Sequence, residues 1–397
     1  MDALVKTSLD AMSNVKKPQK TFIALLLSAL VVFQGKATFR NLSRYSDASE
    51  KRFSRWFRRT FDFVMFNWLI LSDALSSNTE WIAALDASFV GKSGKKTDGL
   101  GMFYNGCAGR SEKGLEISLL SLVNLSSNTA YALDAKQTVD EEGKTRATLY
   151  AEQVVKLADQ LIEKGIKYLA ADAYYFKNKF VTPVMETGLH VISKLRNDAF
   201  LRWAYTGAYS GRGRPKVYDG RVNFKKELDR FDFVGNLDSG EEIYTARVHS
   251  RCLKRWIRVV MLRTQSDDKT GMALLFSTDT ELDALTIIRY YKARFQIEFV
   301  FRDAKQHTGL TDCQSHSKDA IHTHINASLT ALNLLKLTDA TEKDTTGQTV
   351  ISIATWKRCK YNELLLRRVF DELGLSLSDQ KIMDTYRRLS SYGAIAA

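Results

Sequence analysis

Between residues 80 and 195 the sequence alternates between strand-like and helix-like hydrophobic spacing, and this alternation limits the fold more than any other feature. The expected order is strand, strand, strand, helix, strand, helix, strand, at residues 81–90, 114–125, 129–138, 143–164, 166–172, 174–187 and 189–195. Such an order predicts an α/β domain with a mixed sheet and flanking helices. The apolar runs on both sides of this region indicate further helices before it and strands after it.

The charge of the chain indicates the kind of partner it binds. The formal net charge of the 397 residues is +13, which favours a polyanion such as nucleic acid. The four cysteines are scattered without a CxxC pair, as expected for a reducing cytoplasm. The apolar run 21–33 is too short to span a bilayer. We therefore expect a buried helix at 21–33 and no membrane segment.

Two basic segments are candidate contacts with double-stranded DNA. The run EKRFSRWFRRTF alternates aromatic and basic residues, and its basic face comprises Lys51, Arg52, Arg55, Arg58 and Arg59. A basic helix after a helix–turn–helix is typical of DNA readers, although a solvated cationic face gives the same pattern. Arg212 and Arg214 in the run GRGRP resemble an arginine hook for the minor groove, and an ordinary turn is the alternative.

The run YYKARFQIEFVFRDAKQ has the pattern of one amphipathic helix. At 100° per residue, Tyr291, Arg294, Glu298 and Lys305 lie within roughly 60° of one another on it. A carboxylate between two cations can hold a divalent metal beside a phosphate, whereas a solvated face with i,i+4 ion pairs is the simpler alternative. A capping box formed by Thr278 and Glu281 is expected to begin the helix.

Two aspartates occupy positions where apolar residues would pack better. Asp86 lies inside the first expected strand, and Asp172 ends the fourth. Because an unpaired buried carboxylate is unfavourable, each must have a partner or a function.

The spacing Tyr-x2-Arg-x3-Glu-x6-Lys resembles the signature of the YREK group of bacterial insertion-sequence transposases (the insertion sequence four type). The resemblance implies a ribonuclease-H-like mixed-sheet core interrupted by a mostly β insertion. It implies that Asp86, Asp172 and Glu298 form a catalytic metal triad. It also implies that two Mg²⁺ or Mn²⁺ ions bind there, and that Tyr291, Arg294 and Lys305 hold DNA phosphates.

The resemblance also sets the expected organisation of the chain. We expect a helical DNA-binding domain, a first part of the core, the β insertion, a core helix with the signature, and a helical C-terminal region. Their expected bounds are 1–75, 76–195, 196–277, 278–310 and 311–397.

The function implied is cut-and-paste DNA transposition, with metal-dependent strand cleavage followed by attack of a 3′-hydroxyl on target DNA. The expected partners are terminal inverted repeats and target DNA, bound by a homodimer in the cytoplasm at the nucleoid. Two alternatives remain open at this point. One is a structure-specific nuclease with the same fold, and the other is a non-catalytic DNA-binding protein derived from a transposase.

Overall fold

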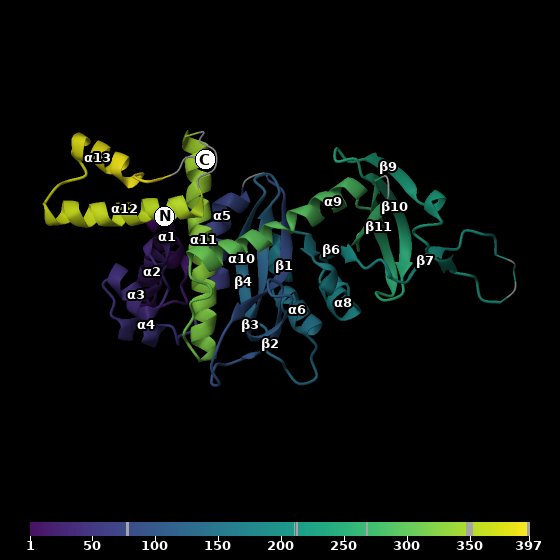
Figure 1. The fold of residues 1–397 in the computed structure, drawn as a ribbon, viewed down its shortest axis with the longest axis horizontal. Helices are drawn as coiled ribbons and strands as arrows, with labels where there is room; N and C mark the ends of the chain where they lie inside the picture. The colour runs from purple at the N-terminus through teal and green to yellow at the C-terminus, as the bar shows by residue number, and fades with distance from the viewer. Residues whose placement is uncertain (77–78, 210, 212, 267–268, 347–351, 395–397) are drawn as a thin grey trace.

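The structure is a computed structural model that describes residues 1–76, 79–209, 211, 213–266, 269–346 and 352–394. Within these residues, twelve strands form one sheet. They are β1 (Trp81–Gly91), β2 (Gly101–Asn105), β3 (Arg110–Asn124), β4 (Thr129–Gln137), β5 (Tyr168–Ala171), β6 (His190–Leu195), β7 (Leu201–Ala204), β8 (Tyr218–Arg221), β9 (Asp232–Asn236), β10 (Glu242–Ser250), β11 (Arg255–Ser266) and β12 (Lys269–Ser277). Figure 1 shows the strands of the core in the middle of the molecule and those of the insertion to one side.

The core of the sheet has the strand order β4-β3-β1-β5-β6. β1 pairs with β3 in antiparallel and with β5 in parallel orientation, and β5 pairs with β6 in parallel orientation. This mixed α/β arrangement is compatible with the expected ribonuclease-H-like core. β2, which the sequence analysis did not identify, is a short strand that pairs with the first residues of β3.

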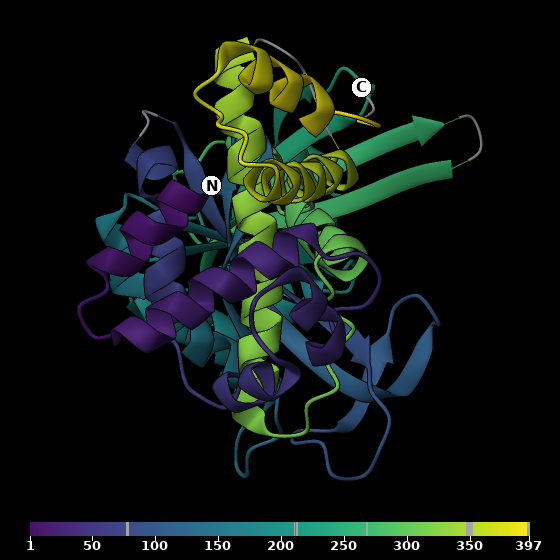
Figure 2. The same ribbon diagram turned by 90° about the vertical axis from the view of Figure 1, so that its left-hand side faces the viewer.

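The insertion continues the sheet of the core. β12 pairs with β6 in antiparallel orientation, and β11, β10, β7 and β8 follow outward from β12. The helical turn η3 (Leu228–Arg230) precedes β9. In Figure 2 the β11–β12 hairpin projects from the body of the molecule.

The side chains of β1 explain why the sheet forms the centre of the core. Ala83 and Leu85 belong to one hydrophobic cluster, whereas Ile82 and Ala84 belong to another. Because successive side chains of a strand point to opposite faces, β1 is buried on both sides. Asp86 is the next residue, directly after this fully buried run.

Three helices pack beside the strands of the core: α6 (Arg146–Val155), α7 (Ala158–Glu163) and α8 (Asn178–Glu186). The single helix expected at 143–164 is therefore two helices. The chain tightens between them, where the amide of Leu157 donates to the carbonyl of Val154 rather than four residues back. Leu157 and Leu161 are both buried as a result.

The region before the sheet is helical, as expected. Its elements are α1 (Asp2–Ala11), α2 (Lys17–Val32), α3 (Phe39–Leu42), the turn η1 (Ser43–Tyr45), α4 (Glu50–Trp56) and α5 (Phe63–Ser76). The apolar run at 21–33 lies in α2, which buries Phe22, Leu26 and Leu30. Among the described residues, no helix combines the length and hydropathy that a membrane span requires.

The last part of the chain consists of α11 (Lys318–Thr346), α12 (Ile353–Glu372) and α13 (Gln380–Ser390). α2 lies against α11, and Figure 2 shows the two crossing. α11 also packs on β4, where the Asn333 side chain bonds both the amide and the carbonyl of Ala132. One hydrophobic cluster includes residues of α2, of the core strands and of α11, so both helical ends share a core with the sheet.

Candidate active site

Two aspartates lie side by side on neighbouring strands. Leu85 of β1 is paired with Ala171 of β5 in parallel register, so the residues that follow them, Asp86 within β1 and Asp172 just after β5, lie at the same level of the sheet. Asp86 Oδ1 accepts a hydrogen bond from the amide of Ala87 at 2.8 Å. The backbone therefore fixes Asp86 where the two strands diverge.

Asp172 is positioned by the turn that follows β5. Its Oδ1 accepts a hydrogen bond from the amide of Tyr174 at 2.8 Å and caps the helical turn η2 (Ala173–Tyr175). The hydroxyl of Ser193 in β6 donates to the carbonyl of Asp172 at 2.6 Å. Both neighbouring segments thus hold the second acid in place.

The signature lies on two helices rather than the one expected. α9 (Ala284–Ala293) ends at Arg294, and α10 (Gln296–His307) begins after Phe295. The expected cap is also wrong. Asp283 caps α9 through the amide of Thr286, whereas the Thr278 hydroxyl accepts a hydrogen bond from the amide of Val191 in β6. Thr278 therefore links the segment after β12 to β6, and α9 begins only after Asp283.

The break between α9 and α10 places Arg294 among the acids. Its Nη1 lies 3.3 Å from Asp86 Oδ2, and its Nη2 lies 2.8 Å from Glu298 Oε1. The Arg294 side chain is only 12% exposed, and its Nε is buried without a hydrogen-bond partner among the described residues. One guanidinium thus bridges the strand acid and the helix acid.

Lys305 and Tyr291 lie on either side of this bridge along the signature. Lys305 Nζ donates to the hydroxyl of Ser88 at 2.8 Å and to the carbonyl of Phe89 at 3.0 Å, both in β1. The half-buried ring of Tyr291 has its centroid 5.8 Å from the guanidinium carbon of Arg294. The four signature residues therefore face the half of β1 that carries Asp86.

Burial makes Asp86 and Asp172 harder to ionise, and neighbouring negative charge adds to the effect at Asp86. Burial raises the pKa of Asp86 to about 6; Arg294 opposes the increase and Asp172 adds to it. Burial also raises the pKa of Asp172, against the effects of the Tyr174 amide and Arg294. Burial lowers the pKa of Lys305 and raises that of Tyr291. A buried group of acids with perturbed pKa values is typical of a functional site.

A comparison with family models decides the class of protein. The model described as transposase DDE domain matches residues 77–334, which is well over half of the chain. The chain belongs to this family. It is therefore an enzyme of the transposase or nuclease type, and the family indicates DNA as its partner.

The other comparisons add less. No curated protein matches. Among solved structures, the NurA nuclease from Sulfolobus solfataricus is similar over 67% of this chain and 86% of that chain. The sequence identity is 10% and the TM-score 0.27, which is too weak a likeness to support an argument.

Enzymes with a transposase DDE domain generally use divalent metal ions, and the side chains present here have suitable chemistry. Asp86, Asp172 and Glu298 offer carboxylate oxygens, which Mg²⁺ and Mn²⁺ prefer. Among the described residues, no three His, Cys, Asp or Glu side chains are arranged to hold a metal ion as they stand. The guanidinium of Arg294 contacts both Asp86 and Glu298.

The basic residues predicted on the N-terminal helix lie at the surface. Lys51 and Arg55 on α4, and Arg58 and Arg59 after it, are exposed, while Arg52 is half-buried. The neighbouring aromatic residues Phe53 and Phe57 are buried. This separation of basic and aromatic faces follows the expected pattern, and DNA contact by this face stays a prediction.

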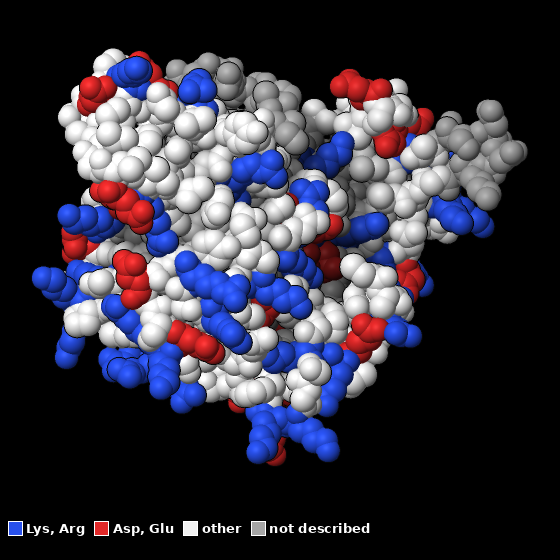
Figure 3. Space-filling model, turned by 60° about the vertical axis from the view of Figure 1, so that its left-hand side comes forward, with Lys and Arg blue, Asp and Glu red and all other residues white. Residues whose placement is uncertain are grey.

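The second basic segment is described only in part. Arg214 is exposed, and Arg212 lies outside the described residues. In Figure 3 lysine and arginine side chains gather on one face of the molecule, around a hollow in which acidic atoms are visible.

Sequence reasoning missed the aromatic wall beside Asp172. Tyr174 is 43% exposed, Tyr175 is buried, and both rings contact the ring of Tyr150 on α6. Lys177 Nζ lies 3.3 Å from the centroid of the Tyr174 ring. The consecutive tyrosines after Asp172 were the available signal, but their contact with α6 depends on the fold.

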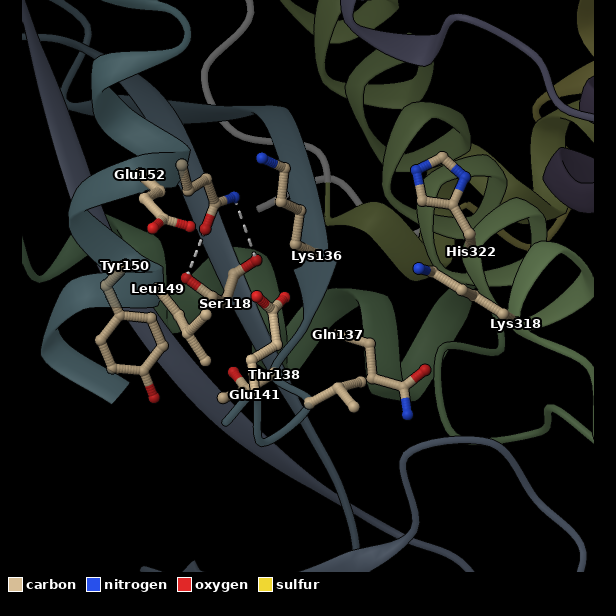
Figure 4. A pocket seen from close by; sticks show the side chains of 12 residues that line it. Ser118, Lys136, Gln137, Thr138, Glu141, Leu149, Tyr150, Glu152, Lys318 and His322 are labelled. Carbon is tan, nitrogen blue, oxygen red and sulfur yellow. Dashed lines mark hydrogen bonds between the residues drawn. The ribbon is translucent and has the colours of Figure 1, made fainter. Parts of the chain in front are cut away.

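A separate cavity opens on the other face of the sheet. Its accessible volume is about 330 Å³, and its lining includes Ser118, Lys136, Glu152, Lys318 and His322. Figure 4 shows these side chains around the cavity, with Ser118 hydrogen-bonded to α6. Ser118 pairs with Ala87 while Leu119 pairs with Asp86, so Ser118 and Asp86 point to opposite faces. The cavity is therefore not part of the acidic site.

Proposed function

We propose that this enzyme is a transposase of the YREK group that moves an insertion sequence by cut-and-paste transposition. The observation that carries the proposal is the bridge of Arg294 between Asp86 and Glu298, with Asp172 beside Asp86. It brings an acid within the sheet and an acid of the signature to one place, where their carboxylates would hold metal ions for phosphoryl transfer.

The acids are the proposed metal ligands. Asp86, Asp172 and Glu298 would hold two Mg²⁺ or Mn²⁺ ions, which would supply Lewis-acid stabilisation for in-line displacement at a DNA phosphate. Burial raises the pKa of Asp86 and Asp172, and a bound cation would offset this effect by stabilising the ionised carboxylates. Without a cation between them, three carboxylates cannot all be ionised at low cost.

The cations of the signature are the proposed phosphate ligands. Lys305 is held against β1 by Ser88 and Phe89, so its ammonium has a defined position on the strand that carries Asp86. Arg294 can offer a planar fork of donors to a phosphate, and Tyr291 lies next to it to orient that fork. These residues would hold the strand in place while its phosphate reacts.

The proposed partners are the terminal inverted repeats of the element and its target DNA. The net charge of +13 and the exposed basic residues of α4 support binding to the DNA backbone. We propose a homodimer in the DNA complex, because excision requires both ends of the element in one assembly. Size-exclusion chromatography with light scattering, with and without end DNA, tests this.

The test of function is a strand-joining assay with Mg²⁺ on DNA that carries the element's end. Wild type is expected to cleave at the end and to join the freed 3′-hydroxyl to target DNA. Asp86→Asn, Asp172→Asn and Glu298→Gln are expected to abolish both steps, and full activity in one of them would remove that residue from the site. The exposed acid Glu281 lies outside the site, and Glu281→Gln is the matched control.

The same assay separates the alternatives. Cleavage without joining would assign the chain to the structure-specific nucleases. Binding of end DNA without cleavage, at any Mg²⁺ or Mn²⁺ concentration, would indicate a non-catalytic DNA-binding protein.

A further inference from the structure

The guanidinium of Arg294 occupies the centre of the acid cluster. Its two terminal nitrogens lie 3.3 Å from Asp86 and 2.8 Å from Glu298, and the whole side chain is 12% exposed. The field of the same guanidinium also reaches the carboxyl of Asp172. The chain thus supplies its own positive charge at the place where the acids converge.

The position of Arg294 is not fully satisfied. Its Nε is buried and donates to no acceptor among the described residues, which is unfavourable for so polar a group. Its guanidinium carbon already lies 5.8 Å from the ring centroid of Tyr291, so the aromatic ring faces Arg294 while it bridges the two acids. The buried, unbonded Nε therefore gives Arg294 a reason to leave the acids when another acceptor enters the site.

We propose that Arg294 is an internal latch that neutralises Asp86 and Glu298 in the absence of DNA and must leave them before divalent ions bind. The inference rests on the proposed role of these acids as metal ligands. It adds an order of events, because a phosphate entering the site competes with Asp86 and Glu298 for the guanidinium. DNA binding and metal loading are then coupled, and each strengthens the other by the same factor.

The first experiment titrates the DNA-free protein with Mn²⁺ and measures free Mn²⁺ by electron paramagnetic resonance. Arg294→Gln is expected to bind Mn²⁺ about tenfold more tightly than wild type, the size of effect that one lost ion pair supports. Arg294→Met keeps the apolar stem and carries the same prediction, should the glutamine variant fold poorly. Arg289→Gln, on the same helix but paired with Glu80, is expected to bind as wild type does.

A charge-matched control distinguishes a latch from a general field effect. Lys305 also faces the site, but it bonds to Ser88 and Phe89 rather than to the acids. Lys305→Gln removes the same charge. It is expected to change Mn²⁺ affinity less than about threefold, because salt screens the interaction of the Lys305 ammonium with the acids. An equal gain in Lys305→Gln and Arg294→Gln would overturn the latch.

The second experiment repeats the titration with a random-sequence duplex of DNA. The Mn²⁺ affinity of wild type is expected to rise on adding the duplex, whereas that of Arg294→Gln is expected to stay the same. Equal Mn²⁺ affinity in wild type and both Arg294 variants would overturn the latch and leave the metal site standing. Failure of every protein to bind Mn²⁺, with or without DNA, would overturn both the latch and the proposed function.

Discussion

Two acids of the β1 segment each pair with an arginine of the α9 segment, and the two pairs differ in their surroundings. Glu80, just before β1, pairs with Arg289 at 2.6 Å, and the side chains are 42% and 52% exposed. Asp86, within β1, pairs with Arg294 at 3.3 Å, and these side chains are 21% and 12% exposed. A carboxylate–guanidinium pair is thus exposed to solvent at Glu80 and largely buried at Asp86.

The difference shows which pair serves structure and which serves function. Tyr290 also donates to Glu80, so that end of the strand is held by an ordinary surface network. At the other end, burial raises the pKa of Asp86 to about 6, and the arginine only partly offsets the effect. A protein keeps so unfavourable a group where its chemistry is needed.

The largest expected difference between the two ends is in catalysis. Asp86→Asn is expected to lower the rate of end cleavage by at least about a thousandfold, because a carboxylate that acts as part of a unit is lost. Glu80→Gln, the matched change at the exposed end, is expected to leave the rate within about twofold. Rates from the strand-joining assay measure both. A large loss in Glu80→Gln would contradict the assignment of the Glu80 pair to structure and the Asp86 pair to catalysis.

The next effect concerns the pH dependence of stability. The pKa of the Asp86 carboxyl is raised from its ordinary value of 3.8 to about 6 in the folded chain, so the folded state binds this proton more tightly than the unfolded chain does. Its contribution to stability is present below pH 3.8 and is lost as the pH rises through 6, at most about 3 kcal/mol.

Asp86→Asn removes this titration. The free energy of unfolding of the variant, relative to that of wild type, is therefore expected to rise between pH 4 and pH 7 in metal-free buffer. Glu80→Gln keeps Asp86 and should retain the wild-type profile. Urea unfolding at several pH values measures this, and parallel profiles for wild type and Asp86→Asn would contradict the raised pKa.

A smaller effect is expected for Lys305, whose ammonium bonds to Ser88 and Phe89 rather than to Asp86 or Glu298. Lys305→Ala is expected to lower end cleavage by about a hundredfold, since it removes a fixed positive charge beside the reacting phosphate. Arg289→Ala removes a cation at the exposed end and should change the rate little. Binding of end DNA by both variants, measured by fluorescence anisotropy, separates loss of catalysis from loss of DNA affinity.

Much of this arrangement was predictable from sequence. The hydrophobic pattern placed Asp86 within the first expected strand and Asp172 at the end of the fourth, because hydrophobic period reflects local burial. That these two strands are neighbours was implied only by the resemblance to the transposase group. The break at Arg294 was not predictable, since YYKARFQIEFVF keeps a helical period across it, whereas in the fold α9 packs mainly on β6 and β12 and α10 mainly on β1 and β4. Likewise Thr278 looked like a cap until its hydroxyl was found bonded to the amide of Val191, a contact far away in sequence.

The smallest effect is the stability contribution of the exposed pair itself. Arg289→Ala is expected to lower the free energy of unfolding by less than about 1 kcal/mol, because exposed ion pairs gain little in water and are screened by salt. The loss should shrink further at 1 M NaCl, where the Debye length falls to about 3 Å. Urea unfolding at low and high salt measures it. The ring centroid of Tyr290 lies 5.3 Å from the guanidinium carbon of Arg289. A loss well above this size, unchanged by salt, would mean that Arg289 stabilises the fold by packing on that ring. The exposed pair would then contribute to stability through packing, as the buried pair does.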